Sequence, residues 1–273
     1  MRIAVLITVH NRKETTLACL KQLYLNRCEG YDIVAYLVDD GSTDGTSEAV
    51  LKQYPKVKII EGDGNLYWCR GMIEAWKHAS KDSPDFYLWL NDDTMLYESA
   101  VSDIMASYSK VDENSVISGA IASTDGKSVS YGGKVNNKLV APNGKMQILD
   151  KFNGNFVLVP RKVYDQFGML DEHFHHAYGD WEYGIRLRRN DVKLYLTPSF
   201  VGVCDRHDKL PKCYNSEVNI IQRFKHLYSP VGPCPSSAFF YDIKCRSIAK
   251  AILNFSYMNI RCAMPYFWSK SKF

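Results

Sequence analysis

The first hundred residues alternate short apolar runs with stretches of helical periodicity, and this alternation restricts the fold more than any other feature of the chain. Apolar runs cover residues 3–9, 33–38, 57–60 and 86–90, and helical spacing follows the first three runs at 13–26, 42–54 and 69–80. Continuous apolar runs are typical of strands that are covered on both faces. Strands and helices in alternation predict an α/β fold with an open, mostly parallel, doubly wound sheet.

The pattern changes after residue 115. Further strands are predicted at 116–122 and 156–159, a helix at 178–190, and short strands at 192–196 and 200–204. A polar excursion over 123–147, rich in Gly and Asn, predicts a hairpin or flap. Because the chain has no repeat and no low-complexity linker, we expect one α/β domain over residues 1–209, followed by a helical extension over residues 210–273.

Composition indicates a folded protein without a membrane span. The chain has 273 residues, of which 46% are hydrophobic and 23% charged, so it can bury a substantial core. No stretch reaches the roughly 18 uncharged apolar residues of a membrane-spanning helix, and the apolar run at 3–9 is too short for a signal peptide. The eight cysteines form no CxxC pair, which favours free thiols in a reducing compartment. We therefore expect a cytoplasmic protein.

Basic residues are concentrated in the C-terminal extension. Residues 205–273 contain 11 Lys or Arg and 4 Asp or Glu, and the totals of 34 and 30 leave 23 and 26 for residues 1–204. Bulky apolar residues alternate with cations after Asp242, and no acidic residue follows it. This composition is typical of peripheral contact with an anionic membrane, although packing on the main domain or in an oligomer is a nearly equal alternative. The tail has no nucleic-acid-binding motif.

Acidic clusters follow two of the predicted strands. Asp39 and Asp40 begin the segment 39–44, which follows the run at 33–38. Asp92 and Asp93 lie just after the run at 86–90. Ligands of parallel sheets bind beyond the carboxyl ends of the strands. Carboxylates at 39–40 can accept hydrogen bonds from a nucleobase or a ribose, and the Asp92–Asp93 pair suits a hard divalent ion on a diphosphate. A helix-capping turn at 39–44 and a solvated turn at 91–93 are the structural alternatives.

A third cluster surrounds Asp180, which follows Gly179. Gly-Asp can begin a helix whose positive N-terminal end stabilises an ionised carboxylate, and such a carboxylate can act as a general base. Trp181 can offer a flat face for ring stacking, and Glu182 is near enough to be a rival base. His207 follows the run at 200–204 and can bind a metal through a neutral imidazole nitrogen. A helix cap, a core tryptophan and an ordinary surface histidine are the structural alternatives.

The order of these motifs resembles that of glycosyltransferase family 2. The matching segments are Thr8-Val9-His10-Asn11-Arg12, residues 39–44, Gly64-Asn65-Leu66-Tyr67-Trp68-Cys69-Arg70-Gly71, Leu90-Asn91-Asp92-Asp93, Asp171-Glu172, Gly179-Asp180, Arg186-Leu187-Arg188 and His207. Each motif is weak, but the ordered set over residues 1–208 is highly specific. The resemblance implies the GT-A fold, a nucleotide-diphosphate sugar donor, Mg²⁺ or Mn²⁺ as cofactor, and inversion of the anomeric centre.

The resemblance also implies a role for each matching residue. Residues of about 1–95 would form the nucleotide-sugar half of the domain, and residues of about 96–209 the acceptor half. The donor would be bound by Thr8, Asn11, Arg12, Asp39, Asp40, Asn65, Arg70 and Asp92, and the metal ion by Asp93 and His207. Asp180 would be the catalytic base, with Trp181 and Glu182 near the acceptor. Two positions depart from the family pattern: Asn91 replaces the first Asp of a DxD motif, and Gly179 stands where Glu is usual.

The segment 64–71 is most similar to that of bacterial rhamnosyltransferase-like members, which build O-antigens, capsules and exopolysaccharides. We therefore expect transfer of a hexose or deoxyhexose from a UDP- or dTDP-linked donor to a hydroxyl of a glycan or lipid-linked acceptor. A sugar nucleotidyltransferase is an alternative, disfavoured because residues 8–12 lack the Gly of a triphosphate-binding loop. A glycan- or nucleotide-binding protein without catalysis is the other alternative.

Overall fold

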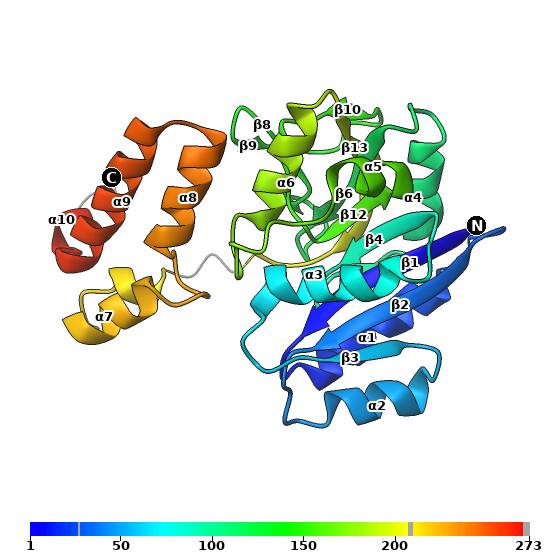
Figure 1. The fold of residues 1–273 in the computed structure, drawn as a ribbon, viewed down its shortest axis with the longest axis horizontal. Coiled ribbons are helices and arrows are strands. Elements are labelled where there is room, and N and C mark those ends of the chain that lie inside the picture. The colour runs from blue at the N-terminus through cyan, green and yellow to red at the C-terminus, as the bar shows by residue number, and fades with distance from the viewer. Residues whose placement is uncertain (27, 207–209, 270–273) are drawn as a thin grey trace.

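The computed structural model describes residues 1–26, 28–206 and 210–269, and one mixed sheet runs through its centre (Figure 1). The strand order is β10-β13-β6-β12-β4-β1-β2-β3, and two short strands pair off this path. The strands on the path are β1 (Arg2–Val9), β2 (Asp32–Asp39), β3 (Lys58–Glu61), β4 (Phe86–Leu90), β6 (Ser115–Ala122), β10 (Gln147–Ile148), β12 (Phe156–Pro160) and β13 (Lys193–Val203).

The N-terminal half of the sheet is parallel and covered on both faces. In register, Ile3 of β1 faces Ile33 of β2 on one side and Phe86 of β4 on the other. Successive residues of a strand point to opposite faces, so Leu6 and Ile7 enter two different hydrophobic clusters. Helices α1 (Lys13–Leu25), α2 (Thr46–Gln53) and α4 (Ala100–Tyr108) cover one face, and α3 (Tyr67–Ser80), α5 (Arg161–Phe167) and α6 (Gly179–Arg188) cover the other. The predicted α/β class is confirmed.

The second half of the sheet contains a reversal and a bulge. Strand β12 runs antiparallel to both β4 and β6, which places the residues before β12 beside the carboxyl end of β4. Strand β13 is parallel to β6 and continuous over 193–203, with register shifts between Leu196 and Gly202. Two short strands were expected there; instead Pro198, which has no N–H to donate to the ladder, lies in a bulge and the strand continues beyond it.

The excursion at 123–147 contains the expected hairpin. Strands β8 (Gly133–Val135) and β9 (Lys138–Leu139) pair around Asn136 and Asn137, whose φ values of 49° and 62° are typical of a two-residue hairpin turn. Strand β8 also pairs with β11 (Lys151–Phe152), forming a small second sheet. The short strands β5 (Met95–Leu96) and β7 (Val129–Tyr131) extend the main sheet beside β13 and β6.

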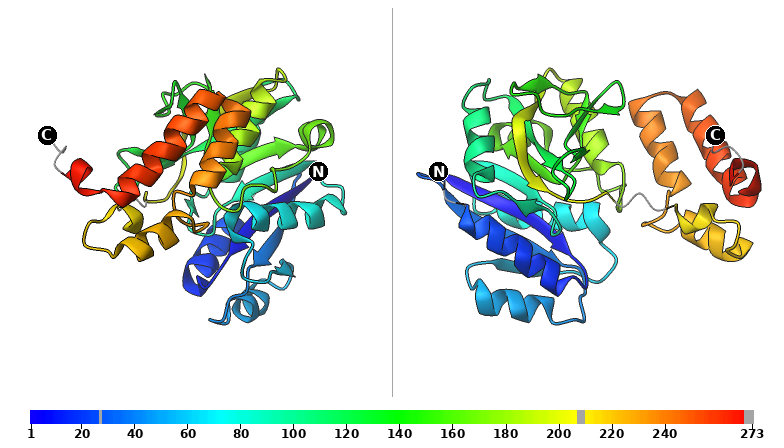
Figure 2. Two further views of the ribbon diagram at one scale, coloured as in Figure 1. Left: turned by 60° about the vertical axis from the view of Figure 1, so that its left-hand side comes forward. Right: turned by 180° about the vertical axis from the view of Figure 1, so that it is seen from behind.

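Helices form the C-terminal region. After a short 3₁₀ turn at Lys212–Tyr214 follow α7 (Ile220–Leu227), α8 (Pro235–Cys245), α9 (Ile248–Ala263) and α10 (Tyr266–Ser269). Helix α8 packs against α6 of the main domain, and α9 packs on the far side of α8 (Figure 2). Tyr241 of α8 joins the core cluster of the main domain. In the part of the chain that the structure describes, no helix is long and apolar enough to cross a membrane.

Candidate active site

The carboxyl ends of β1, β2 and β4 meet at two adjoining cavities. The central cavity, of about 530 Å³, is lined by Asn91, Asp93, Tyr131, Asn153, Gly154, Asn155, Ala177, Tyr178, Asp180 and Trp181. The β1 cavity, of about 390 Å³, is lined by Thr8, Val9, His10, Asp40, Gly64, Tyr67 and Val231. Arg12, Trp68, Asp92 and His176 line both cavities, so the two form one continuous hollow at the sheet edge.

Arg12 joins the two carboxylates that follow β4. Its Nε lies 3.3 Å from Asp92 Oδ2, and its Nη2 donates a hydrogen bond of 3.0 Å to Asp93 Oδ2. Burial raises the pKa of Asp92 to about 7, and Arg12 opposes this rise. One guanidinium therefore faces two carboxyl groups. When both are ionised, the Arg12–Asp92–Asp93 group has a net negative charge and attracts a further cation.

The oxygen atoms of this pair fit a hard divalent cation. Asp92 Oδ2 is buried and accepts no hydrogen bond from the described residues; Arg12 Nε lies 3.3 Å away as an ion pair, so the oxygen keeps lone pairs for a ligand. Residues 1–26, 28–206 and 210–269 contain no group of three or more His, Cys, Asp or Glu side chains that could hold a metal ion. Mg²⁺ commonly takes one or two protein carboxylates and completes its shell with water and substrate phosphates, so Asp92 and Asp93 fit such an ion. The other expected ligand, His207, lies outside the described residues.

Asn91 has a structural partner in the cavity wall. The indole Nε1 of Trp68 donates a hydrogen bond of 2.8 Å to Asn91 Oδ1. The ring lies so close to Gly154 that a Cβ at that position would approach it to 2.3 Å. The residue at the first position of the DxD-like motif thus holds the Trp68 ring, and Asp92 and Asp93 supply the carboxylates.

The carboxylate of Asp40 organises the turn that begins α3. Its Oδ1 accepts hydrogen bonds from the N–H groups of Gly64 and Leu66, and its Oδ2 accepts them from Leu66 and Tyr67. Asp39 similarly accepts from Ser42 N at 2.9 Å. Asp40 lines the β1 cavity with Thr8, but its carboxylate is occupied by backbone donors. These Asp40 contacts hold the turn before α3, not the start of the helix that follows segment 39–44, and the donor-binding role of Asp39 and Asp40 stays a prediction.

Four expected donor-binding residues, Asn11, Asp39, Asn65 and Arg70, are not among the residues that line the two cavities. Asn11 connects the loops after β1 and β2, because its Oδ1 accepts from Thr43 N at 2.7 Å. Asn65 is exposed and its N–H donates to Asp63 Oδ1 at 2.9 Å. Arg70 lines a separate hollow beside Glu172, where its Nε donates to the carbonyl of Glu172 at 3.1 Å.

Asp180 lies at the first turn of α6 with its carboxylate in the central cavity. Its Oδ2 accepts from Gly154 N at 3.1 Å and its Oδ1 from Trp181 N at 2.8 Å. Burial raises the pKa of Asp180 to about 6, and these two hydrogen bonds oppose the rise. A carboxylate with a pKa close to neutral is suited to accept a proton.

Position 179 requires glycine because the start of α6 lies in contact with α3. A Cβ at Gly179 would lie 2.4 Å from Cys69 Sγ, and Cys69 N donates to the carbonyl of His175 at 2.9 Å. A glutamate, usual in the family at this position, would not fit without movement of one helix. The support for Asp180 comes instead from the N–H of Gly154 on the facing loop.

Trp181 lies in an aromatic group that includes the C-terminal region. Its ring meets Tyr178 at a centroid distance of 5.8 Å and Tyr241 of α8 at 6.1 Å, both edge to face. Tyr178, with a φ of 75° just before α6, is in a left-handed conformation that is strained for a residue with a side chain. Trp181 remains partly exposed at the cavity wall.

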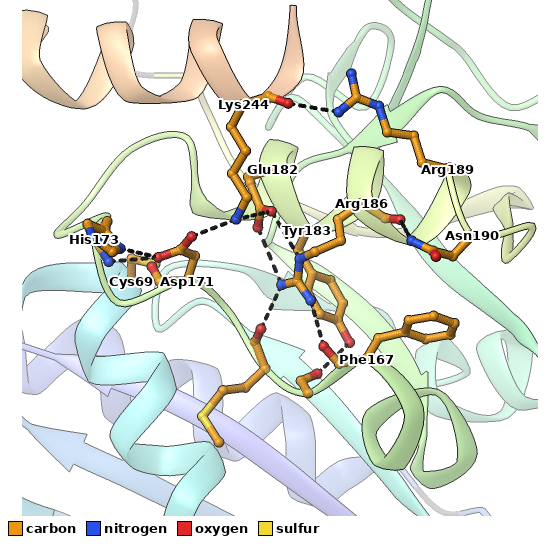
Figure 3. A network of polar contacts seen from close by, with 12 residues as sticks. Cys69, Phe167, Asp171, His173, Glu182, Tyr183, Arg186, Arg189, Asn190 and Lys244 are labelled. Atoms are coloured by element: carbon orange, nitrogen blue, oxygen red, sulfur yellow. Dashed lines mark hydrogen bonds and ion pairs between the residues drawn. The ribbon is translucent and has the colours of Figure 1, made fainter.

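Glu182 is not among the residues that line the central cavity, and its carboxylate lies in a network of ion pairs (Figure 3). Its fully buried carboxylate lies 3.0 Å from Arg186 Nε and 2.7 Å from Lys244 Nζ. The ammonium of Lys244 also binds Asp171 Oδ2 at 2.6 Å. Residues two apart on a helix do not face each other, so Glu182 cannot share the surroundings of Asp180, and we do not retain it as a rival base or acceptor residue.

Several cavity residues were not expected from the sequence. Asn153, Gly154 and Asn155 reach the cavity because β12 reverses direction, and Asn155 O accepts a hydrogen bond of 3.0 Å from Asn91 N. His176, in the loop before α6, lines both cavities. Burial lowers the pKa of His176, which favours a neutral ring at neutral pH.

Comparisons with solved structures agree on the architecture. The mannosyltransferase PcManGT from Pyrobaculum calidifontis, in complex with GDP-Man and Mn²⁺, is 13% identical with a TM-score of 0.58, over 99% of this chain and 75% of that chain. TarS 1-349 of S. aureus, in complex with UDP-GlcNAc, is 13% identical with a TM-score of 0.58, over 97% of this chain and 89% of that chain. At this identity the two structures show the fold, which is GT-A.

The sequence comparison gives the family. A search of curated proteins found no match. The family model described as glycosyl transferase family 2 matches residues 4–204, which cover the central sheet from the third residue of β1 onward and the acidic residues that follow β2 and β4. The chain therefore belongs to glycosyl transferase family 2.

Proposed function

We propose that this glycosyltransferase moves a hexose or deoxyhexose from a UDP- or dTDP-linked donor to a hydroxyl of a glycan or lipid-linked acceptor, with inversion of the anomeric centre. The assembly of cell-surface polysaccharide, such as O-antigen or capsule, is the proposed setting. One observation carries the proposal: Asp180, a carboxyl group suited to accept a proton, lines the same cavity as the Arg12–Asp92–Asp93 group.

The donor occupies the hollow from the β1 cavity towards Asp92 and Asp93. Arg12 binds the diphosphate by charge-assisted hydrogen bonds, and the turn held by Asp40 supports the nucleoside end. A Mg²⁺ or Mn²⁺ ion held by Asp93, with Asp92 beside it, would supply positive charge against the departing diphosphate. His207, which is outside the described residues, is the second proposed ligand.

Transfer proceeds by direct displacement at the anomeric carbon. Asp180 accepts the proton of the acceptor hydroxyl while that oxygen forms a bond to the anomeric carbon. The bond between the anomeric carbon and the diphosphate oxygen breaks at the same time, and its electron pair leaves with the nucleoside diphosphate. Attack from the face opposite the leaving group inverts the configuration.

A donor panel tests the proposal. UDP-, GDP- and dTDP-sugars are added to the full chain with Mn²⁺, and binding is measured as a rise in melting temperature, because a ligand of the native state stabilises it. Slow hydrolysis of the radiolabelled donor that binds then distinguishes a transferase from a binding protein. A UDP- or dTDP-sugar should raise the melting temperature and be hydrolysed. Stabilisation by nucleoside triphosphates alone would favour a nucleotidyltransferase and contradict the proposal.

We also propose that helix α9 binds an anionic membrane surface near a lipid-linked acceptor. The helix packs against α8, α7 and the 3₁₀ turn at Lys212–Tyr214, and it also exposes apolar residues, which are Ile248, Ile252, Leu253, Phe255, Tyr257 and Ile260. Lys250 and Arg261 lie on the same helix, and no acidic residue follows Asp242. Apolar groups mixed with cations are characteristic of interfacial helices, and each cation near anionic lipid adds about 1 kcal/mol.

Flotation with liposomes tests the membrane proposal in the full chain. The variant I252D/L253D places two charges at positions that are 54% and 68% exposed, so it should fold but lose binding to anionic vesicles. The control Leu51→Asp, at an exposed position on α2, should bind normally. Binding should weaken at high salt. Equal flotation of all three proteins would contradict the proposal, as would a stable dimer that α9 variants convert to monomer.

A further inference from the structure

Two lysines from the small sheet meet at Trp181, next to the proposed base. Lys134 of β8 and Lys151 of β11 face each other in antiparallel register, so their side chains project from the same face of the sheet. Their Nζ atoms lie 4.5 Å and 4.3 Å from the centroid of the Trp181 ring. Trp181 and Asp180 both line the central cavity. The lysine pair is therefore attached to the cavity wall that holds the base.

Among the residues that the structure describes, no carboxylate forms an ion pair with either ammonium group. In the described ranges, the hydrogen bond from Lys151 Nζ to Asn137 Oδ1 at 2.9 Å and the contacts with Trp181 are the close polar contacts of the pair. Lys151 is 4% exposed. Burial, and then the charge of Lys134, lower the pKa of Lys151 to about 8, and burial lowers the pKa of Lys134. A buried cation beside a half-buried one, with no carboxylate in direct contact among the described residues, is costly.

The surrounding charges distinguish this pair from the Arg12 group. Apart from each other, the groups that act electrostatically on the two lysines are Asp180, Arg206, Arg246 and Cys245, whereas Arg12 interacts with Asp92 and Asp93. Arg246 is itself paired with Asp242 at 3.1 Å. The two cationic groups are thus separate: Arg12 lines the hollow where the donor diphosphate is proposed to bind, and the lysine pair lies against the ring of Trp181, which lines the central cavity next to Asp180.

We propose that Lys134 and Lys151 bind an anionic group of the acceptor, a phosphate or a carboxylate, while Trp181 packs against the acceptor sugar. This inference rests on the proposed function, because it names the chemical class of acceptor used at the same site. An anion between the two ammonium groups would relieve their mutual repulsion and orient the acceptor hydroxyl towards Asp180. Phosphate and carboxylate share this chemistry, and the experiment separates them.

Binding of small sugars tests the inference. The full chain is first saturated with whichever of UDP, GDP and dTDP gives the largest thermal shift, so that the donor pocket is filled. Galactose 6-phosphate, glucuronate and glucose are then titrated and followed by calorimetry. One of the two anionic sugars should bind at least tenfold more tightly than glucose, and the one that does identifies the anion. Equal binding of all three sugars would overturn the proposal.

Variants assign the binding to the lysine pair. Lys134→Met and Lys151→Met should each weaken binding of the anionic sugar at least tenfold, without altering the thermal shift given by the nucleoside diphosphate. The control Lys138→Met, at an exposed position on the neighbouring strand β9, should bind normally, and Lys151→Arg should recover most of the affinity. Unchanged binding in both Met variants would show that the lysines only pack against Trp181. If no nucleoside diphosphate shifts the melting temperature, the proposed function fails instead.

Discussion

Replacing Asp180 with asparagine separates the chemical role of this carboxyl group from its cost to the fold. Burial raises the pKa of Asp180 to about 6, from an ordinary value of 3.8. A carboxyl group whose pKa is higher in the folded than in the unfolded state favours folding while it is protonated. The free energy of unfolding is therefore highest below the unfolded-state pKa, and it falls as the pH rises through about 6. At pH 7.5 the ionised group therefore lowers the free energy of unfolding by about 3 kcal/mol relative to a neutral group, at about 1.4 kcal/mol per pKa unit.

Asp180→Asn removes this charge at nearly constant volume. The asparagine Oδ1 can still accept from Trp181 N, but its NH₂ group would face the N–H of Gly154, and the lost hydrogen bond costs about 1 kcal/mol. The expected net gain is about 2 kcal/mol at pH 7.5, or a rise in Tm of about 4–8 °C for a chain of this size. At pH 4.5 the gain should largely disappear, because Asp180 is then mostly protonated in the fold.

Thermal unfolding by circular dichroism at both pH values measures the effect, and donor-to-acceptor transfer is assayed on the same preparations. Transfer should fall by roughly two to four orders of magnitude, with donor binding retained. The control Asp165→Asn, on an exposed side chain of α5, should change stability by less than about 0.5 kcal/mol. A variant less stable than the wild type at pH 7.5, or a difference independent of pH, would refute the argument from burial. Near-normal transfer would refute the role as base.

Three further predictions follow from the site. The kcat/KM of the wild type should rise with pH through an apparent pKa of about 6 as Asp180 ionises, and a profile that is flat between pH 5 and 7 would contradict this. Excess EDTA should stop transfer and Mn²⁺ should restore it, whereas Asp93→Asn should need at least tenfold more Mn²⁺; full activity in EDTA would leave Arg12 as the cation on the diphosphate. Lys244→Met should reduce the free energy of unfolding by about 2–4 kcal/mol, since it removes two charge-assisted hydrogen bonds of about 1.5–3 kcal/mol each, discounted for partial exposure. As a control, Lys77→Met removes an exposed ion pair with Glu74 and should lower the free energy of unfolding by less than about 0.5 kcal/mol. Equal unfolding midpoints of the two variants in urea would contradict the stabilising role of the Lys244 network.

The parallel half of the fold could be predicted because its signals are local. An apolar run followed by helical spacing predicts a strand and a helix from that segment of sequence alone. Once the strands are known to be parallel, the acidic residues after β2 and β4 are expected at the same edge of the sheet. Asp93 and Asp180 line one cavity, as their proposed roles require. The rule that ligands bind beyond strand ends therefore located the edge of the sheet where the cavity lies, together with its acidic residues.

The remainder of the site depends on long-range packing that leaves no periodic signal. Asn155 reaches Asn91 only because β12 is inserted antiparallel between β4 and β6, and no local pattern fixes that position. Glu182 looked like a rival to Asp180 because the two are close in sequence, although the helix turns them to different sides. Its partner Lys244 comes from a helix that the sequence assigned to a separate extension.

The packing of α8 against α6 has a consequence for recombination between members of the family. A sequence alignment would suggest a crossover near residue 209, where the family match ends and the composition changes. A chimera joined there would receive a foreign α8, without a lysine to neutralise Glu182 or an aromatic ring beside Trp181. Crossovers placed after Cys245 would inherit both contacts from the same parent. Shuffled enzymes should therefore retain activity far more often when α6 and α8 descend together than when they are separated.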